Sequence, residues 1–410
     1  MRSFPSNERN HMRPVFSRRH LLQSGAIAAG SAVLSACGSS SKKITVQPET
    51  PAVQPKHPAP EVQSGGGNTM RIFASSGFCE DAARIQTGLD RLAAAGFSIT
   101  NHTAAYRRFQ RFSGTDEQRI ADFQDVATGR VPTPKVLMGT RGGYGAIRLL
   151  PHIDWKSLGA RMRDRQTLLF GFSDVTAVQL ALLAQGGMPS FAGPMLYSEF
   201  AKPEPNVYTM ESFIRTTTAP ALSVGVSAYQ RSPVREAEGV LWGGNLSVLA
   251  SLAGSPYMPQ IQGGILFLED VAEQPYRIER MLQTLHLAGI LKSQQAVLLG
   301  DFRMGNIRDA YDSSYDLANV AQAVSRAAGI PVYTGFPFGH VANKTSFPLG
   351  ARARLSPNGG GGFQVSFAEY PRLDAGALNL NALLPPPPPV DFTGQQPQPV
   401  NGGDAGDAAE

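Results

Sequence analysis

The sequence predicts an α/β protein with two domains: an N-terminal domain built on a parallel sheet, and a C-terminal α/β domain with a β-rich end. Two patterns support the parallel and β-rich parts of this prediction. Apolar strand-like runs alternate with amphipathic helices between residues 70 and 185. Residues 348–368 alternate between apolar and polar side chains, as in an antiparallel hairpin. We therefore expect domains at 69–200 and 239–380.

The N-terminal domain begins with a strand that runs into a loop of small residues. The expected strands are 70–77, 97–100, 135–139 and 167–172, and the expected helices are 80–95, 116–129, 146–150 and 175–185. Strands that alternate with helices form a parallel sheet with helices on its faces, so we expect a Rossmann-like domain. Active sites of such sheets gather at the carboxyl ends of the strands, and two notable motifs, 140–145 and 171–176, follow strands.

The C-terminal domain contains a second set of buried strands. The segment 239–245 is followed by an expected helix that ends at Leu252. We expect strands at 264–268, 296–302 and 330–335, and a helix at 276–288. The stretch 201–238 is poorly periodic and contains prolines, which predicts an interdomain linker region.

The charge of the chain does not indicate a nucleic-acid partner. The formal net charge is +5, from 37 Lys and Arg against 32 Asp and Glu. Residues 1–36 hold five arginines and one glutamate, so 32 basic and 31 acidic residues remain after them. A nucleic-acid binder needs a basic face, and no Lys/Arg-rich run follows residue 36.

The N-terminus has the pattern of an export signal. Ser17-Arg18-Arg19 resembles a twin-arginine signal, and the apolar stretch Leu21–Ala36 is shorter than the roughly 20 residues of a membrane span. Residues 34–37 (Leu-Ser-Ala-Cys) resemble a lipobox, in which small residues precede the cut and a thiol accepts the lipid. Residues 1–37 therefore predict a signal peptide, and acylated Cys37 would anchor the protein to a membrane of the cell envelope, facing the periplasm.

Two further segments are expected to be disordered. Residues 38–68 are rich in Ser, Pro, Gln and Gly without periodicity, which indicates a tether. Residues 381–410 form a proline-rich tail. The second cysteine, Cys79, is expected to be a single packed residue, because two widely separated cysteines do not make a disulfide framework.

Ser173 is a candidate nucleophile. It lies between an apolar strand and an amphipathic helix, where a tight turn would project its Oγ into the crevice above a helix N-terminus. The N–H of Asp174 would then be a natural oxyanion donor. Ser and Asp are also favoured as plain helix caps, so the local sequence alone leaves both interpretations open.

Residues 141–145 (Arg-Gly-Gly-Tyr-Gly) follow another strand. Adjacent glycines let the backbone approach a ligand closely and point N–H groups inward, so Gly142 and Gly143 could supply the other half of an oxyanion hole. A phosphate loop is the alternative, but the Walker lysine is absent.

A serine nucleophile requires a base and an orienting acid. Four histidines lie in the folded region, and of these His340 follows a strand and a glycine-bounded loop, whereas His102, His152 and His286 do not. Glu269 follows the strand 264–268, but the adjacent Asp270 is as plausible from the residues alone. No His-Glu-x-x-His or Cys-x-x-Cys pattern indicates a metal, so a mechanism without metal or cofactor is expected.

These motifs together resemble the bacterial LD-carboxypeptidases. The matching stretches, in chain order, are 141–150, 171–176, 193–195, 239–246, 266–270 and 339–340. The resemblance implies a catalytic triad of Ser173, Glu269 and His340, shared between the two domains. It also implies that Gly142, Gly143 and Asp174 supply the oxyanion donors.

The resemblance further implies that Trp242 and Asn245 line the substrate site, with a glycine turn and a packed indole as the structural alternative. The implied reaction releases terminal D-alanine from murein tetrapeptide stems, so peptidoglycan stem peptides are the expected partner. The family also implies a homodimer. The export signal and the proline-rich tail depart from the family pattern, because typical members recycle murein in the cytoplasm.

Two other functions remain open at this point. One is a peptidase resembling the microcin-immunity enzymes of the same family, in which a longer insertion is expected between the serine and the glutamate. The other is a lipoprotein that binds stem peptides without cleaving them.

Overall fold

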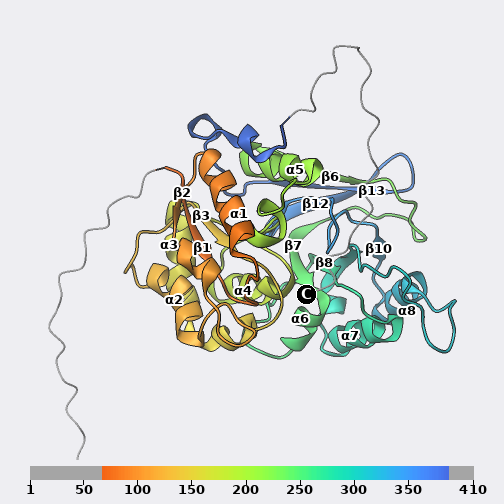
Figure 1. Ribbon diagram of the computed structural model, residues 1–410. Coiled ribbons are helices and arrows are strands. Elements are labelled where there is room, and N and C mark those ends of the chain that lie inside the picture. The colour runs from red at the N-terminus through yellow and green to blue at the C-terminus, as the bar shows by residue number, and fades with distance from the viewer. Residues whose placement is uncertain (1–66, 387–410) are drawn as a thin grey trace, which may run out of the picture. The chain divides into compact units, whose positions relative to one another are not determined.

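The computed structural model describes residues 67–386 (Figure 1). The predicted signal peptide with Cys37, nearly all of the tether and the tail from residue 387 lie outside the described residues. Between residues 67 and 386, no helix combines the length and the apolar composition needed to cross a membrane.

The first sheet has six strands and is parallel except at one edge. In spatial order they are β11 (Phe347–Leu349), β5 (Ser190–Ala192), β4 (Leu168–Gly171), β3 (Val136–Gly139), β1 (Thr69–Phe73) and β2 (Ser98–Thr100). Strands β3 and β4 are buried along their whole length, which explains why they appear in the sequence as continuous apolar runs. The predicted parallel N-terminal sheet is confirmed.

Helices alternate with these strands. They are α1 (Ala82–Ala94), α2 (Asp116–Ala127), α3 (Trp155–Arg165) and α4 (Thr176–Ala181), with short turns η1 (His102–Tyr106), η2 (Ala146–His152), η3 (Ser173–Val175), η4 (Leu182–Gly186) and η5 (Leu196–Phe200). Local sequence fixes where they begin: Asp81 caps α1, and Thr115 with Gln118 forms a capping box at α2. Helices α2 and α3 pack against each other.

The second sheet has seven strands and is mixed. In spatial order they are β10 (Val332–Thr334), β9 (Gln294–Leu299), β8 (Gly264–Glu269), β7 (Ala237–Asn245), β12 (Ala351–Pro357), β13 (Phe363–Ala368) and β6 (Ala221–Val226). The pairs from β10 to β7 are parallel, and those from β7 to β6 are antiparallel. The expected α/β domain with a β-rich end is therefore confirmed.

Helices of this part lie beside the parallel strands. They are α6 (Leu246–Ser251), α7 (Pro275–Leu287) and α8 (Leu317–Ala328), with the short 3-10 segment η6 (Leu291–Ser293). Two later 3-10 segments, η7 (Ala375–Ala377) and η8 (Leu380–Leu383), return to the first domain, where η8 contacts α1. Helix α7 contacts both α6 and α8 (Figure 1).

The stretch 201–238 is not the linker that the sequence predicted. It contains the helix α5 (Val207–Thr218) and the strand β6, whose residues pair with β13 in the second sheet. Burial in β6 alternates strictly, but its outward positions are the small residues Ala221, Ser223 and Gly225. The alternation was therefore weak in the sequence.

The two sheets share one apolar core around β11. Phe347 of β11 packs edge-on against Phe267, Phe336 and Phe338, at centroid distances of 5.1, 4.9 and 5.3 Å. A strand near the C-terminal end of the chain thus completes the first sheet and fills the core between the sheets.

Candidate active site

Ser173 follows β4 at its carboxyl end, as predicted. Its backbone has φ 59°, in the left-handed region that side chains other than glycine rarely adopt. Strain of this kind persists where surrounding structure fixes the backbone, and it is concentrated at functional sites. The side chain is buried except for 8% of its surface. The turn therefore holds the hydroxyl at one position at the start of α4.

Gly142 lies directly against this hydroxyl. A Cβ added to Gly142 would come within 2.6 Å of Ser173 Oγ and 3.6 Å of the Asp174 backbone nitrogen. Gly143 has φ 113°, and its Cβ would lie 3.3 Å from the nitrogen of Gly77. The glycine at 142 thus lets the backbone approach Ser173 closely, and the glycine at 143 lets it approach Gly77.

Glu269 and His340 form a buried pair. Glu269 ends β8 and has no exposed surface, and its Oε2 lies 2.8 Å from His340 Nδ1. His340 lies in the loop after β10, and its ring packs edge-on against Phe172, with 5.2 Å between centroids. Because Phe172 precedes Ser173, the Glu269–His340 pair lies beside the serine turn, and the catalytic roles of the three residues stay a prediction.

Asn245 supports this pair from behind. Its amide nitrogen donates to Glu269 Oε1 (3.3 Å) and Asp270 Oδ1 (3.2 Å), and its Oδ1 accepts from Ser247 and Val248. All four hydrogen-bonding positions of the side chain are occupied within the protein. This corrects the expectation that Asn245 contacts substrate, because the side chain orients the acids instead.

Asp270, the alternative orienting acid, has a different role. Its carboxylate accepts hydrogen bonds from the backbone N–H groups of Ser247 and Val271, both at 2.9 Å. Burial, followed by the charge of Glu269, raises the pKa of Asp270 to about 6. The structure therefore separates the two acids: Glu269 faces the imidazole and Asp270 faces the backbone.

The side chains of two other predicted residues, Trp242 and Asp174, make hydrogen bonds within the protein. Trp242 has no exposed surface, and its indole N–H donates to Gln294 Oε1 at 2.9 Å. This corrects the expectation that Trp242 lines the substrate site, because the indole packs within the core. The buried side chain of Asp174 is tied to the start of η2, because its Oδ2 accepts from the N–H of Ala146 at 2.9 Å. Burial raises the pKa of Asp174.

A buried ion pair beside the site was not found from the sequence. Lys344 Nζ lies 2.9 Å from Glu199 Oε1 and 5.0 Å from the centroid of Phe172, and both charged side chains are 5% exposed. The position of Lys344, four residues after His340, matches no sequence motif that indicates a buried ion pair. Only its unusual burial identifies it.

The loop of His340 is held by α5. Thr209 Oγ1 accepts from Lys344 N (2.9 Å) and donates to Ala342 O (2.7 Å). Further along, Ser346 N donates to Ser212 Oγ, and Thr216 Oγ1 donates to Ser346 O. Helix α5 is therefore a platform for the loop that carries the proposed base.

The remaining candidates lie elsewhere. His102 and His152 are exposed in short turns, and His286 is half-buried on α7. Among residues 67–386, no group of three or more His, Cys, Asp and Glu side chains is arranged to hold a metal ion.

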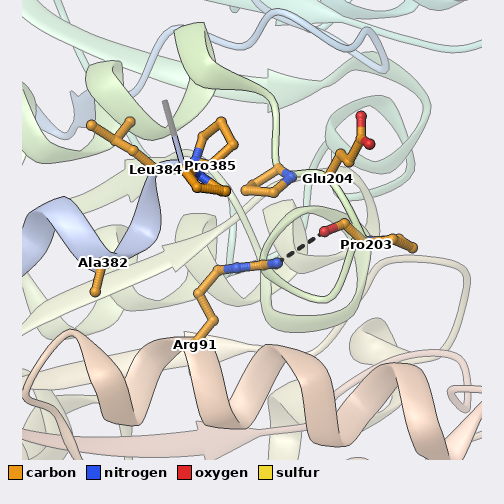
Figure 2. Close-up of a pocket in the computed structure, with 8 residues that line it drawn as sticks. Arg91, Pro203, Glu204, Ala382, Leu384 and Pro385 are labelled. Atoms are coloured by element: carbon orange, nitrogen blue, oxygen red, sulfur yellow. Dashed lines mark hydrogen bonds between the residues drawn. The ribbon is translucent and has the colours of Figure 1, made fainter. Parts of the chain in front are cut away.

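Figure 2 shows a pocket of about 590 Å³ that shares no residue with this site. Arg91 from α1 reaches into it and donates to the carbonyl of Pro203 at 3.2 Å, and also to those of Phe200 and Lys202. The opposite wall carries Ala382, Leu384 and two prolines that follow. Since the guanidinium is committed to backbone carbonyls, the pocket offers no free cation to a ligand.

A serine on a strained strand-to-helix turn, beside a buried carboxylate–histidine pair, defines a serine hydrolase. Comparison with known proteins identifies the family. Residues 70–193 match the LD-carboxypeptidase N-terminal domain, and residues 238–355 match the LD-carboxypeptidase C-terminal domain. The chain belongs to the LD-carboxypeptidase (peptidase S66) family.

Individual relatives agree with this assignment. The murein tetrapeptide carboxypeptidase of Pseudomonas aeruginosa is 31% identical over 276 residues, covering 64% of this chain and 84% of the relative. The crystal structure of muramoyltetrapeptide carboxypeptidase from Oxalobacter formigenes is 38% identical with a TM-score of 0.67, covering 74% of this chain and all of that one. The microcin C7 self-immunity protein of Escherichia coli is 28% identical over 337 residues, covering 73% of this chain and 93% of the relative.

Proposed function

We propose that this chain is an exported, lipid-anchored LD-carboxypeptidase that releases terminal D-alanine from murein tetrapeptide stems during cell-wall turnover. The observation that carries the proposal is the buried Glu269–His340 pair, whose imidazole packs beside the strained Ser173 turn. The substrate is supported by the relatives named as murein tetrapeptide carboxypeptidases. The location is supported by the twin-arginine and lipobox patterns of the sequence.

The reaction assigns each residue a step. Glu269 accepts a hydrogen bond from Nδ1–H of His340, which leaves Nε2 to accept the proton of Ser173. Ser173 Oγ attacks the carbonyl between the L-centre of the third residue and the terminal D-alanine. His340 then donates its proton to the leaving amine, and Glu269 stabilises the imidazolium. Water, activated by the same imidazole, hydrolyses the acyl-enzyme.

The tetrahedral intermediate requires donors for its oxyanion. The N–H of Asp174 and an N–H of Gly142 or Gly143 are the proposed donors, because both segments border Ser173 Oγ. Each such donor is worth about 3 kcal/mol of barrier.

The test is mass spectrometry of the protein without residues 1–37, incubated with murein tetrapeptide beside a Ser173→Ala control. Release of D-alanine and tripeptide by wild type alone is expected. Release by both proteins would remove Ser173 from the mechanism, and release by neither, with both folded, would refute the proposed reaction.

The anchoring proposal has a separate test. In cells, full-length protein should incorporate radiolabelled palmitate and fractionate with membranes, whereas Cys37→Ser should do neither. Replacement of Arg18 and Arg19 by lysine should leave the protein unprocessed in the cytoplasm. Wild type that remains unlabelled would refute lipidation without affecting the enzymatic proposal.

A second substrate is favoured by one specific observation, the likeness to the microcin C7 self-immunity protein. Structures of that protein hold glutamyl sulfamoyl guanosine and aspartyl sulfamoyl adenosine, at 25% identity and a TM-score of 0.62. Measuring kcat/KM for such compounds beside the murein tetrapeptide discriminates the two. We expect the tetrapeptide to be preferred.

A further inference from the structure

Three loops at the carboxyl edge of the first sheet form one surface beside Ser173. They are residues 75–78 after β1, residues 107–113 after β2 and η1, and residues 141–145 after β3. Backbone hydrogen bonds join them: Gly77 N donates to Gly142 O (3.1 Å) and Phe78 N donates to Arg111 O (3.3 Å). The surface is therefore fixed by main-chain contacts, independently of its side chains.

This surface carries two exposed arginines that lie over aromatic rings, which we call the arginine–aromatic rim. Arg108 lies over Phe78 with its guanidinium carbon 4.0 Å from the ring centroid, and Arg111 lies over Tyr144 at 5.5 Å. Stacking uses the face of a guanidinium and leaves its N–H groups, which lie in the plane, free to form a two-pronged bond with a carboxylate.

Neither arginine forms a salt bridge with an Asp or Glu side chain within residues 67–386. Their neighbour Arg107 is different, because it pairs with Asp122 at 2.6 Å. The sequence contains no Asp or Glu between Asp90 and Asp116, so the loop has no acid of its own. Two guanidinium groups without a salt bridge, on the surface beside Ser173, favour an anionic ligand.

The rim adjoins the nucleophile. Tyr144 is two residues from Gly142, which contacts Ser173 Oγ. The positive charge of Arg111 also reaches Asp174, the residue after the serine: burial raises the pKa of Asp174, and the charges of Arg119 and Arg111 oppose that rise. A peptide whose carbonyl meets Ser173 therefore has its neighbouring groups within reach of the rim.

We propose that the arginine–aromatic rim binds carboxylates of the stem peptide, with Arg111 as the main contact and Arg108 as the second. This inference rests on the proposed function, because it concerns the substrate of that site. A murein tetrapeptide offers carboxylates from two sources: the terminal D-alanine, and the glutamate and diaminopimelate residues before it.

The experiment combines variants of the rim with amidated substrates. Arg111→Gln, Arg108→Gln and Arg111→Lys are compared with Arg354→Gln, an exposed arginine of β12 that lies on the second sheet. Each is tested on the tetrapeptide, on a peptide with amidated internal carboxylates, and on a peptide with a C-terminal amide. Thermal melts establish that the exposed substitutions leave the fold intact.

Arg111→Gln should lower kcat/KM for the tetrapeptide about tenfold, mainly through KM, as expected for a charge-assisted hydrogen bond. Arg108→Gln should have a smaller effect in the same direction. Arg111→Lys should recover part of the loss, and Arg354→Gln should have no effect. If amidation removes the carboxylate that Arg111 binds, the kcat/KM of wild type should fall to that of Arg111→Gln. The kcat/KM of Arg111→Gln should be the same for the amidated and the unmodified peptide.

If Arg111→Gln lowered kcat/KM equally on all three substrates, the proposal that the rim binds a carboxylate would be wrong. An equal loss of kcat/KM in Arg354→Gln would also refute it. A second measurement distinguishes failure of the rim from failure of the proposed function. It is the affinity of the tetrapeptide, measured by calorimetry, for Ser173→Ala and for Ser173→Ala/Arg111→Gln. Binding that weakens with Arg111→Gln supports the rim even where wild type shows no turnover. Binding that is unchanged, or absent altogether, refutes it.

Discussion

The buried pair of Lys344 and Glu199 yields a quantitative prediction. Lys344 Nζ is held by Glu199 Oε1 at 2.9 Å and by Val341 O at 2.6 Å, while Glu199 Oε2 accepts from Met195 N at 2.8 Å. Lys344→Met would leave the carboxylate of Glu199 buried without its cation. Removal of one partner from a buried pair costs about 3–5 kcal/mol of unfolding free energy.

The double variant Glu199→Gln/Lys344→Met should be much less damaging. It removes both charges, and the amide oxygen of Gln can still accept from Met195 N. Replacement of a whole buried pair is often neutral, so we expect a loss of no more than about 2 kcal/mol. The matched control is Arg352→Met, which breaks an ion pair with Glu238 that is 73% and 54% exposed and should cost under about 1 kcal/mol.

Urea denaturation followed by tryptophan fluorescence measures these differences. Single substitutions whose costs simply add in the double variant would refute the coupling. A Lys344→Met cost no larger than that of Arg352→Met would refute the claim that the pair is buried and interdependent.

The same pair should affect catalysis with a recognisable sign. Glu269 contacts His340 directly, and Asp270 acts on Glu269. The Lys344–Glu199 pair is close because both Lys344 and the His340 ring lie against Phe172. Lys344→Met leaves a net negative charge, which favours the imidazolium and moves the acidic limb of the kcat/KM profile to higher pH. Glu199→Gln leaves a net positive charge and should move that limb to lower pH. Shifts in the same direction would indicate a loss of structure instead.

Three further predictions follow from single residues. Gly142→Ala should lower kcat on the order of 100-fold, because its Cβ would displace Ser173 Oγ, whereas Gly225→Ala, which meets no atom within 4 Å, should be unaffected; steady-state kinetics distinguishes them. The pKa of Asp270 is raised from 3.8 to about 6, so the folded state holds its proton longer. Wild type should therefore lose about 2 kcal/mol of unfolding free energy relative to Asp270→Asn as pH rises from 4 to 7, and a flat difference in denaturation would contradict this. Burial raises the pKa of Cys79 to about 12, so the folded protein should react with iodoacetamide at pH 8 at least about 100-fold more slowly than after unfolding, as mass spectrometry would show.

The sequence predicted many of the strands and helices whose buried positions are apolar, although it missed α3 and α8, which also bury apolar side chains. It did not predict α5, and the reason is physical. The buried side of α5 carries the hydroxyls of Thr209, Ser212 and Thr216, which bond to the loop after His340. A helix that buries polar groups has an apolar periodicity that no longer marks its inner face.

In the candidate active site, too, the sequence could assign some residues and not others. Ser173 could be placed from its strand-to-helix context, but the choice between Glu269 and Asp270 could not be made from adjacent residues alone. That choice depends on long-range partners: His340 meets one acid, and the backbone of Ser247 meets the other. Such partners leave no local pattern, because they lie in different segments that only the fold brings together.

The proposed nucleophile and base come from different sheets, so the joint between the sheets must be as rigid as the site. Three contacts that contribute to that joint lie close in sequence to a predicted catalytic residue. Thr176, three residues after the serine, accepts from Asn245 N at 3.0 Å, and Asn245 in turn holds Glu269. Lys344, four residues after the histidine, pairs with Glu199, and β11, which follows soon afterwards, joins the first sheet. The contacts that assemble the fold thus also fix the segments that carry the proposed triad.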